Sequence, residues 1–152
     1  MPNRPLKVYW DSCCFLAILN GETEEDACKE TIHQAKSGEI ELYVSPLTMA
    51  ETVRPRLSPK PTPKEVRDRV VDFFENDYIK VVNIEREVAR RSLDFCWDHN
   101  LHARDALHVA LALECECEIF ETLDKTLLAL RIDGIIIQKP ARKGQMEIAP
   151  NS

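Results

Sequence analysis

The 152-residue sequence predicts an α/β protein, a three-layer α/β/α sandwich with a central, mostly parallel sheet of about five strands. Short segments rich in β-branched and aromatic residues alternate with longer segments that have helical periodicity. Strands that alternate with helices pair in parallel through right-handed crossovers. The hydrophobic content of 44% and the charged content of 30% are typical of a globular protein. We expect one domain at residues 1–139 and a flexible tail at residues 140–152.

The first predicted strand, residues 6–10, ends in Val-Tyr-Trp, the residue types that a strand packed on both faces requires. It stops at Asp11, and an apolar helical segment follows at residues 12–19. A carboxylate is costly to bury, so an Asp in this place is expected to cap a helix, to pair with a charge or to bind a metal ion. Because ligands bind at the carboxyl ends of strands in open α/β sheets, Asp11 marks the expected ligand-binding edge.

Start and stop signals define the remaining elements. Ser45-Pro46 begins a helix as an N-cap followed by proline, and Thr62-Pro63 repeats the signal. Between them, residues 54–63 contain four prolines, which predict a stiff, exposed loop. The segment at 101–116 is apolar on nearly every side and predicts a central buried helix. The other predicted elements are strands at 40–44, 79–82, 118–124 and 134–137 and helices at 23–36, 63–76, 84–99 and 126–130.

Composition narrows the class of protein. No apolar run approaches the roughly 20 residues that span a bilayer, and residues 1–5 lack the apolar region of a signal peptide. We therefore expect a cytoplasmic protein with no membrane association. The six cysteines form no C-x-x-C pair, so neither a zinc site nor a disulfide framework is predicted. The net charge of −6 argues only mildly against nucleic acid binding, because a divalent ion would cancel the charge of a carboxylate cluster.

Four acidic residues are candidates for the ligand-binding edge. Asp11 and Asp124 end predicted strands, Glu51 lies in the helix after the second strand, and Asp105 begins the central helix. Each has an ordinary explanation when taken alone, because an Asp can complement a helix dipole or form a turn and a helical Glu is usually solvated. The sequence does not show how the connection at 100–103 would bring Asp105 to this edge.

If these carboxylates converge, they repel one another and require a cation. A set of three or four carboxylate ligands suits Mg²⁺ or Mn²⁺ rather than zinc. Such a metal activates a water molecule and screens a scissile phosphate, and a second ion can stabilise the leaving oxygen. Convergence of the four acids would therefore indicate phosphoryl chemistry.

Four segments resemble the motifs of the PIN-domain family, and they keep the order Asp, Glu, Asp, Asp. The Asp-Ala-x-His-x-Ala run is the most specific of them. The size and layout are similar to those of VapC-like toxins from toxin–antitoxin pairs. The four segments are residues 8–12 (VYWDS), 45–51 (SPLTMAE), 104–110 (RDALHVA) and 120–124 (FETLD).

The resemblance implies a Mg²⁺- or Mn²⁺-dependent ribonuclease that acts on RNA, forms a homodimer and is held inactive by a small antitoxin protein. The proline-rich stretch and the cysteines are not family requirements, and they leave the subfamily open. The catalytic, metal-binding acids that the resemblance implies are Asp11, Glu51, Asp105 and Asp124, and the supporting hydroxyl groups are those of Ser12 and Thr122.

Basic residues near the acids are candidates for substrate contacts. Residues 54–69 contain six basic residues against two acids, and they either line a path for a phosphate backbone or form a solvated face. Arg54 and Arg56 are the substrate-binding candidates in this stretch. Arg104 adjoins Asp105, so it either contacts a substrate phosphate or pairs with an acid.

Three other side chains allow two interpretations each. His108, one helical turn beyond Asp105, is either a general base or a hydrogen-bonded core residue. Phe95 and Trp97 either pack in the core or stack on bases or a second copy of the chain.

Two other functions stay open beside the toxin ribonuclease. A phosphatase with Asp11 as its nucleophile would need a second Asp two residues later, where the sequence has Cys13. A non-catalytic regulatory or nucleic-acid-binding module would keep the fold without the activity, and the presence of all four acids argues against it.

Overall fold

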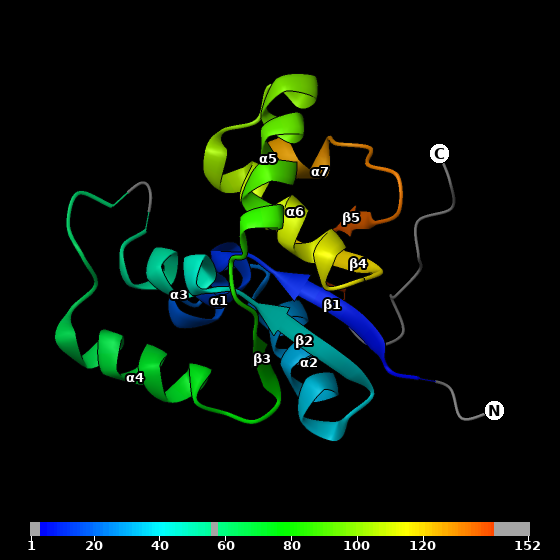
Figure 1. Ribbon diagram of the computed structural model, residues 1–152. Coiled ribbons are helices and arrows are strands. Elements are labelled where there is room, and N and C mark those ends of the chain that lie inside the picture. Colours follow the sequence, from blue (N-terminus) through cyan, green and yellow to red (C-terminus); the bar gives the residue numbers. More distant parts are fainter. Residues whose placement is uncertain (1–3, 56–57, 142–152) are drawn as a thin grey trace.

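The computed structural model describes residues 4–55 and 58–141. Its five strands form one sheet in which every pair is parallel, in the order β3-β2-β1-β4-β5 (Figure 1). The parallel central sheet that the sequence predicts is thereby confirmed. The strands are β1 (Leu6–Trp10), β2 (Ile40–Val44), β3 (Ile79–Val81), β4 (Ile119–Glu121) and β5 (Ile136–Gln138).

Helices cover both faces of this sheet. Side chains of α1, α2 and α4 pack in one apolar cluster, and side chains of α5, α6 and α7 pack in a second. This arrangement is the predicted three-layer sandwich. Within the described ranges, no helix is long and apolar enough to cross a membrane. The helices are α1 (Ser12–Leu19), α2 (Glu25–Ser37), α3 (Pro46–Val53), α4 (Lys64–Phe74), α5 (Arg86–His99), α6 (Ala103–Glu114) and α7 (Lys125–Leu128).

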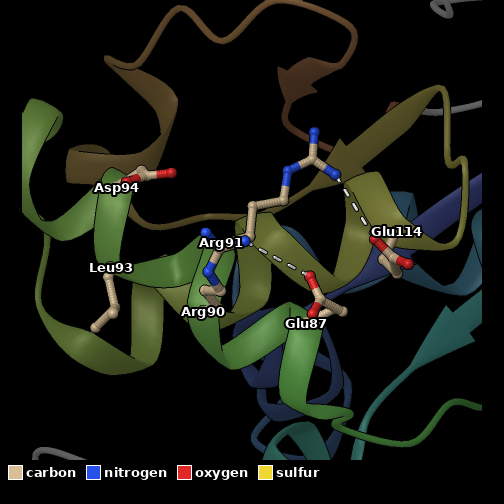
Figure 2. Close-up of a pocket in the computed structure, with 6 residues that line it drawn as sticks. All are labelled: Glu87, Arg90, Arg91, Leu93, Asp94 and Glu114. Atoms are coloured by element: carbon tan, nitrogen blue, oxygen red, sulfur yellow. Dashed lines mark ion pairs between the residues drawn. The ribbon is translucent and has the colours of Figure 1, made fainter.

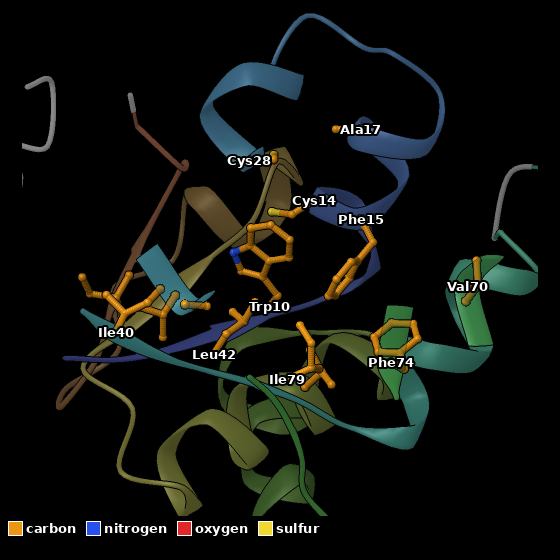
Figure 3. Close-up of a cluster of buried hydrophobic side chains, with 14 residues drawn as sticks. Trp10, Cys14, Phe15, Ala17, Cys28, Ile40, Leu42, Val70, Phe74 and Ile79 are labelled. Atoms are coloured by element: carbon orange, nitrogen blue, oxygen red, sulfur yellow. The ribbon is translucent and has the colours of Figure 1, made fainter. Parts of the chain in front are cut away.

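The central strand β1 contributes to both apolar clusters. Because successive side chains of a strand point to opposite faces, Val8 and Trp10 belong to the cluster under α1 and Tyr9 to the cluster under α6. Trp10 lies beside Cys14 and Phe15 in the first cluster (Figure 3), with the Trp10 and Phe15 ring centroids 4.8 Å apart. Burial on both faces explains why β1 carries large apolar residues at consecutive positions.

The order of the strands creates a switch point between β1 and β4. After β1 the chain adds β2 and β3 on one side, and it then returns to add β4 and β5 on the other. The return is made by α5 and α6, which pack against each other and are joined at Asn100 in the left-handed conformation (φ 53°). Because α6 leads back to the start of β4, its first turn lies at the carboxyl edge, which answers the question that the sequence left open for Asp105.

Some boundaries differ from those predicted. Strand β4 ends at Glu121, so Asp124 is not the end of a strand but the N-cap of α7. Helix α3, by contrast, ends at Val53, directly before the predicted loop at 54–63, because the residue before Pro55 is disfavoured in helical conformation. All but the first two residues of the expected tail, 140–152, lie outside the described residues.

Candidate functional site

A pocket of about 390 Å³ lies at the carboxyl edge of the sheet, and all four predicted acids line it. Asp11 follows β1, Glu51 lies in α3, Asp105 lies in the first turn of α6, and Asp124 precedes α7. The parallel topology brings these four distant segments to one edge, at the switch point where open α/β sheets bind ligands. The other lining residues are Ser12, Cys13, Leu16, Pro55, His108 and Thr126.

Asp11 is buried at the start of α1, which it caps. Its Oδ1 accepts a hydrogen bond from the Cys13 backbone N–H at 3.1 Å, and its Oδ2 accepts one from the Thr122 hydroxyl at 2.6 Å. Burial raises the pKa of Asp11 to about 6, although nearby His108 and these two hydrogen bonds favour the charged form. A cation in the pocket would favour the ionised carboxylate further.

Glu51 is held by two side chains of α6. Its Oε1 lies 2.7 Å from Nε2 of His108, and its Oε2 lies 3.6 Å from Nη1 of Arg104. The helix that carries Glu51 begins with a capping box formed by Ser45 and Thr48. The capping box fixes the start of α3, and the contacts with α6 then join the two helices across the pocket.

Asp124 and Asp105 both lie at helix starts. Oδ1 of Asp124 accepts hydrogen bonds from the backbone N–H groups of Thr126, at 2.8 Å, and Leu127, at 3.2 Å. Asp105 is buried in the first turn of α6, where a negative charge complements the helix dipole. The ordinary structural explanations therefore apply to both residues, and both also line the pocket.

The two predicted hydroxyl groups lie at different depths. Thr122 is fully buried, and its hydroxyl donates to Asp11 and accepts from the backbone N–H of Asp124 at 3.1 Å. Thr122 thus joins two of the acids across the switch point. Ser12 lines the pocket at the first position of α1.

The predicted substrate-binding arginines do not share one environment. Arg104 contacts Glu51, with a partly exposed guanidinium group. Arg54 donates to the backbone carbonyl groups of Ser58 and Pro59, so its side chain closes the proline-rich loop. Arg56 lies outside the described residues.

The pocket offers the ligand type that Mg²⁺ and Mn²⁺ prefer, namely carboxylate oxygens. Among residues 4–55 and 58–141, however, no group of three or more His, Cys, Asp or Glu side chains is arranged to hold a metal ion. Oxygens of Asp11, Glu51 and Asp124 accept hydrogen bonds or pair with protein groups instead. A bound ion would compete with these protein groups for the same oxygens.

The sequence did not show the partners of two buried polar side chains, His108 and Glu121. Nδ1 of His108 lies 2.7 Å from the Tyr9 hydroxyl. Glu121 is 2% exposed and accepts hydrogen bonds from Nε1 of Trp10 at 2.7 Å and from the Thr31 hydroxyl at 2.8 Å. Burial raises the pKa of Glu121. The only sequence signal for Glu121 was a charged residue inside an apolar strand.

The sequence matches the family model of the PIN domain over residues 8–132. This match spans most of the chain, and the protein therefore belongs to the PIN domain family, as its motifs indicate. A search of curated proteins finds no match.

Solved structures of toxin–antitoxin proteins share the fold. A toxin–antitoxin complex from Klebsiella pneumoniae aligns with a TM-score of 0.65 and 17% identity, over 89% of this chain and 98% of that one. VapBC2 from Rickettsia felis, bound to a DNA fragment from its promoter, aligns with a TM-score of 0.64 and 15% identity, over 88% of this chain and 98% of that one. VapC20 from Mycobacterium tuberculosis, a Sarcin-Ricin loop cleaving toxin, aligns with a TM-score of 0.62 and 11% identity, over 78% of this chain and 90% of that one. At these identities the likeness is one of fold.

Proposed function

We propose that the protein is a metal-dependent endoribonuclease that hydrolyses RNA phosphodiester bonds, and that it is the toxin of a toxin–antitoxin pair. The proposal is carried by one observation: four carboxylates from separate segments line a single pocket at the switch point of a PIN-domain chain. The fold likeness to VapC20, a Sarcin-Ricin loop cleaving toxin, supports it.

In this proposal Asp11, Glu51, Asp105 and Asp124 are the metal ligands and Mg²⁺ or Mn²⁺ is the metal. The bound ion supplies an activated water molecule and screens the scissile phosphate. The protein contributes a pocket in which Asp11, Asp105 and Asp124 lie at the starts of helices, while Glu51 is held by two side chains of α6.

Other residues have supporting roles in the proposal. Thr122 orients Asp11 through its hydrogen bond, and Ser12 offers a second hydroxyl at the pocket wall. Arg104, with its side chain 38% exposed, is placed to meet a substrate phosphate beside Glu51. Arg54 and Arg56 would attract the RNA backbone along the proline-rich loop, whose local charge is positive although the protein's net charge is −6.

The proposal includes two protein partners and a place of action. Solved complexes of similar fold contain an antitoxin, which supports a small antitoxin as the inhibitor of this protein. A second copy of the chain would complete a homodimer, and the cytoplasm is the proposed site of action.

The proposed activity is tested by incubating the purified protein with a mixed RNA pool in the presence of Mg²⁺, Mn²⁺ or EDTA. Asp11→Asn and Asp105→Asn test the acids, and Glu39→Gln, at an exposed position before β2, is the matched control. We expect cleavage that depends on metal, that is lost in both pocket variants and that is retained in the control. Circular dichroism establishes that each variant is folded. Metal-independent cleavage, or cleavage retained by folded Asp11→Asn, would contradict the proposal.

A non-catalytic PIN-like module is the second candidate, and one observation favours it. The described acids are engaged by protein groups and do not form a ready metal cluster. A folded protein that binds RNA but leaves it uncut under every metal condition would support this candidate.

A further inference from the structure

A buried chain of hydrogen bonds reaches the pocket from the core. The Tyr9 hydroxyl lies 3.1 Å from Oγ of Ser45 and 2.7 Å from Nδ1 of His108. On the other side of the imidazole, Nε2 lies 2.7 Å from Oε1 of Glu51. Three of the four residues are fully or almost fully buried, and only the carboxylate of Glu51 is partly exposed.

The orientation of His108 is fixed on both sides. Its side chain is 1% exposed and packs against the rings of Tyr9 and Phe120, with centroid distances of 5.6 and 6.3 Å. In a neutral imidazole one nitrogen donates and the other accepts. The Glu51 carboxylate can only accept, so the proton of this contact lies on Nε2, which donates to Oε1. The imidazole is therefore held with a donor directed at one oxygen of this acid.

We propose that His108, held by Tyr9, is a positioning residue that orients the Glu51 carboxylate for metal binding, an inference that rests on the proposed metal site. Hydrogen-bond partners of ligating groups fix their orientation and tune their affinity for the metal. The sequence suggested that His108 is either a general base or a core residue. In this proposal it is a core residue that acts on the pocket through Glu51.

The test measures the affinity of the purified protein for Mn²⁺ by isothermal titration calorimetry, without RNA. His108→Leu removes the donor, and His108→Gln keeps an N–H group that can reach Glu51. We expect affinity to fall by roughly 10- to 100-fold in His108→Leu and to be partly restored in His108→Gln. Tyr9→Phe removes the hydroxyl that contacts Nδ1 of His108, and it should give a smaller loss of Mn²⁺ affinity. Thr31→Val removes a buried hydroxyl from the other face of the sheet and should leave Mn²⁺ affinity unchanged.

The outcomes separate this inference from the proposed function. If the wild-type protein binds Mn²⁺ and both His108 variants bind it with the same affinity as the wild type, the positioning role is overturned. This holds even if thermal unfolding shows that both variants are destabilised. Absence of Mn²⁺ binding by the wild-type protein would overturn the proposed metal site, and the positioning role with it.

A second, independent observation concerns the face of α5 that points away from the sheet. Leu93 and Trp97 are 66% and 89% exposed, the two most exposed large hydrophobic side chains in the described ranges. Residues four apart lie on one face of a helix. Leu93 borders a hollow of about 500 Å³ in which Arg91 pairs with Glu114 of α6 (Figure 2). An exposed Trp is a typical anchor residue of a protein interface.

Charges along this face differ between its two halves. The first half carries Arg86 and Arg90, and the second half carries Asp94 and Asp98. Glu87 in the first turn is the exception, and Arg90 pairs with it loosely, at 4.0 Å and with both side chains exposed. A helix with a basic first half and an acidic second half complements an antiparallel copy of itself.

We propose that the α5 stripe, defined as Arg90, Leu93, Asp94 and Trp97, packs against the same stripe of a second copy, with the two α5 helices antiparallel. This inference gives a surface to the homodimer of the proposed function and rests on it. A two-fold axis beside the Ser92–Leu93 segment would bring the two copies of Leu93 close together and place each Arg90 within side-chain reach of the other copy's Asp94. The same arrangement would cover both copies of Trp97.

The test is the dissociation constant of self-association, measured by sedimentation velocity without RNA or metal. Arg90→Asp and Asp94→Arg each place like charges together, so each should weaken the dimer by about tenfold or more. The combined variant restores opposite charges and should regain most of the affinity. Val71→Glu, at a partly exposed position of α4, is the matched control and should leave the dissociation constant unchanged.

A wild-type protein that stays monomeric would overturn this inference, and so would a dimer that the single reversals leave unchanged or that the combined variant does not recover. If Leu93→Glu instead abolished binding of an antitoxin to a monomer, the stripe would be the antitoxin surface. None of these results depends on RNA cleavage, so they test the dimer surface separately from the proposed nuclease activity.

Discussion

Thr122 is the residue through which two acids of the pocket are connected, because its hydroxyl contacts both Asp11 and the backbone before α7. Thr122→Val keeps the shape and removes the hydroxyl. We expect a loss of about 1–3 kcal/mol in the free energy of unfolding. The loss should be larger at pH 8 than at pH 5, because Asp11, with its pKa of about 6, accepts a stronger hydrogen bond when ionised. Urea titration with EDTA measures both values.

The control for this prediction is Thr126→Val, because Thr126 is exposed in α7. Its free energy of unfolding should change by less than about 0.5 kcal/mol. An equal loss in the two variants would show that the hydrogen bond to Asp11 is not the cause.

Glu121 gives a prediction of pH dependence away from the pocket. Burial raises its pKa above the ordinary value of 4.5, so the folded protein binds this proton more tightly than the unfolded chain does. The contribution of Glu121 to stability is therefore fully present below pH 4.5 and is lost as the pH rises through the pKa of the folded state. Glu121→Gln removes this titration, and the variant should gain stability relative to the wild-type protein as the pH increases.

Thermal or urea unfolding between pH 4 and pH 8 tests the Glu121 prediction. Glu39→Gln, at an exposed position, provides the comparison. A stability difference between Glu121→Gln and wild type that is constant over this range would contradict it.

At the scale of elements, Phe15 joins α1 and α4 to the central strand. Its ring centroid lies 4.8 Å from that of Trp10 in β1, and 5.1 and 4.8 Å from those of Phe73 and Phe74 in α4. Phe15→Ala should cost about 3–5 kcal/mol in the free energy of unfolding, because it leaves a cavity among these rings. Amide hydrogen exchange should also quicken in α4, which depends on this cluster.

Val71→Ala is the matched control for Phe15, because Val71 lies on α4 and is 36% exposed. The expected change in its free energy of unfolding is under about 0.5 kcal/mol. Exchange in α4 that Phe15→Ala leaves unchanged would show that α4 is held by other contacts.

The elements themselves could be predicted from the sequence because local signals define them. The Ser45-Pro46 start of α3 and the consecutive apolar residues of β1 correspond to the observed structure. The predicted strand at 118–124 continues three residues past the observed end of β4 at Glu121, since Thr122 and Asp124 follow an apolar run without any breaker. Their side chains bond the backbone of the next turn, and this local pairing ends the strand.

At the scale of the whole molecule, the convergence of the acids followed from the parallel topology, whereas their partners did not. The bond between Tyr9 and His108 joins residues 99 positions apart, and that between Arg54 and Ser58 depends on the path of a loop. A periodic pattern shows which face of an element is buried but not which side chain it meets. For this reason the sequence left His108 as either a general base or a core residue without showing its bond to Glu51, and it did not show the contact that Arg54 makes within the loop.

The position of β4 beside β1 has a consequence for how the protein is made. Asp11 leaves the ribosome well before its partner Thr122, which is 111 positions later in the sequence. Until that segment emerges, the sheet lacks β4, and the pocket lacks both Asp124 and the hydroxyl that orients Asp11. A nascent chain would therefore carry three of the four acids without an assembled site. If the protein is the proposed RNA-cutting toxin, this order of synthesis delays its activity until the segment with Thr122 and Asp124 has left the ribosome.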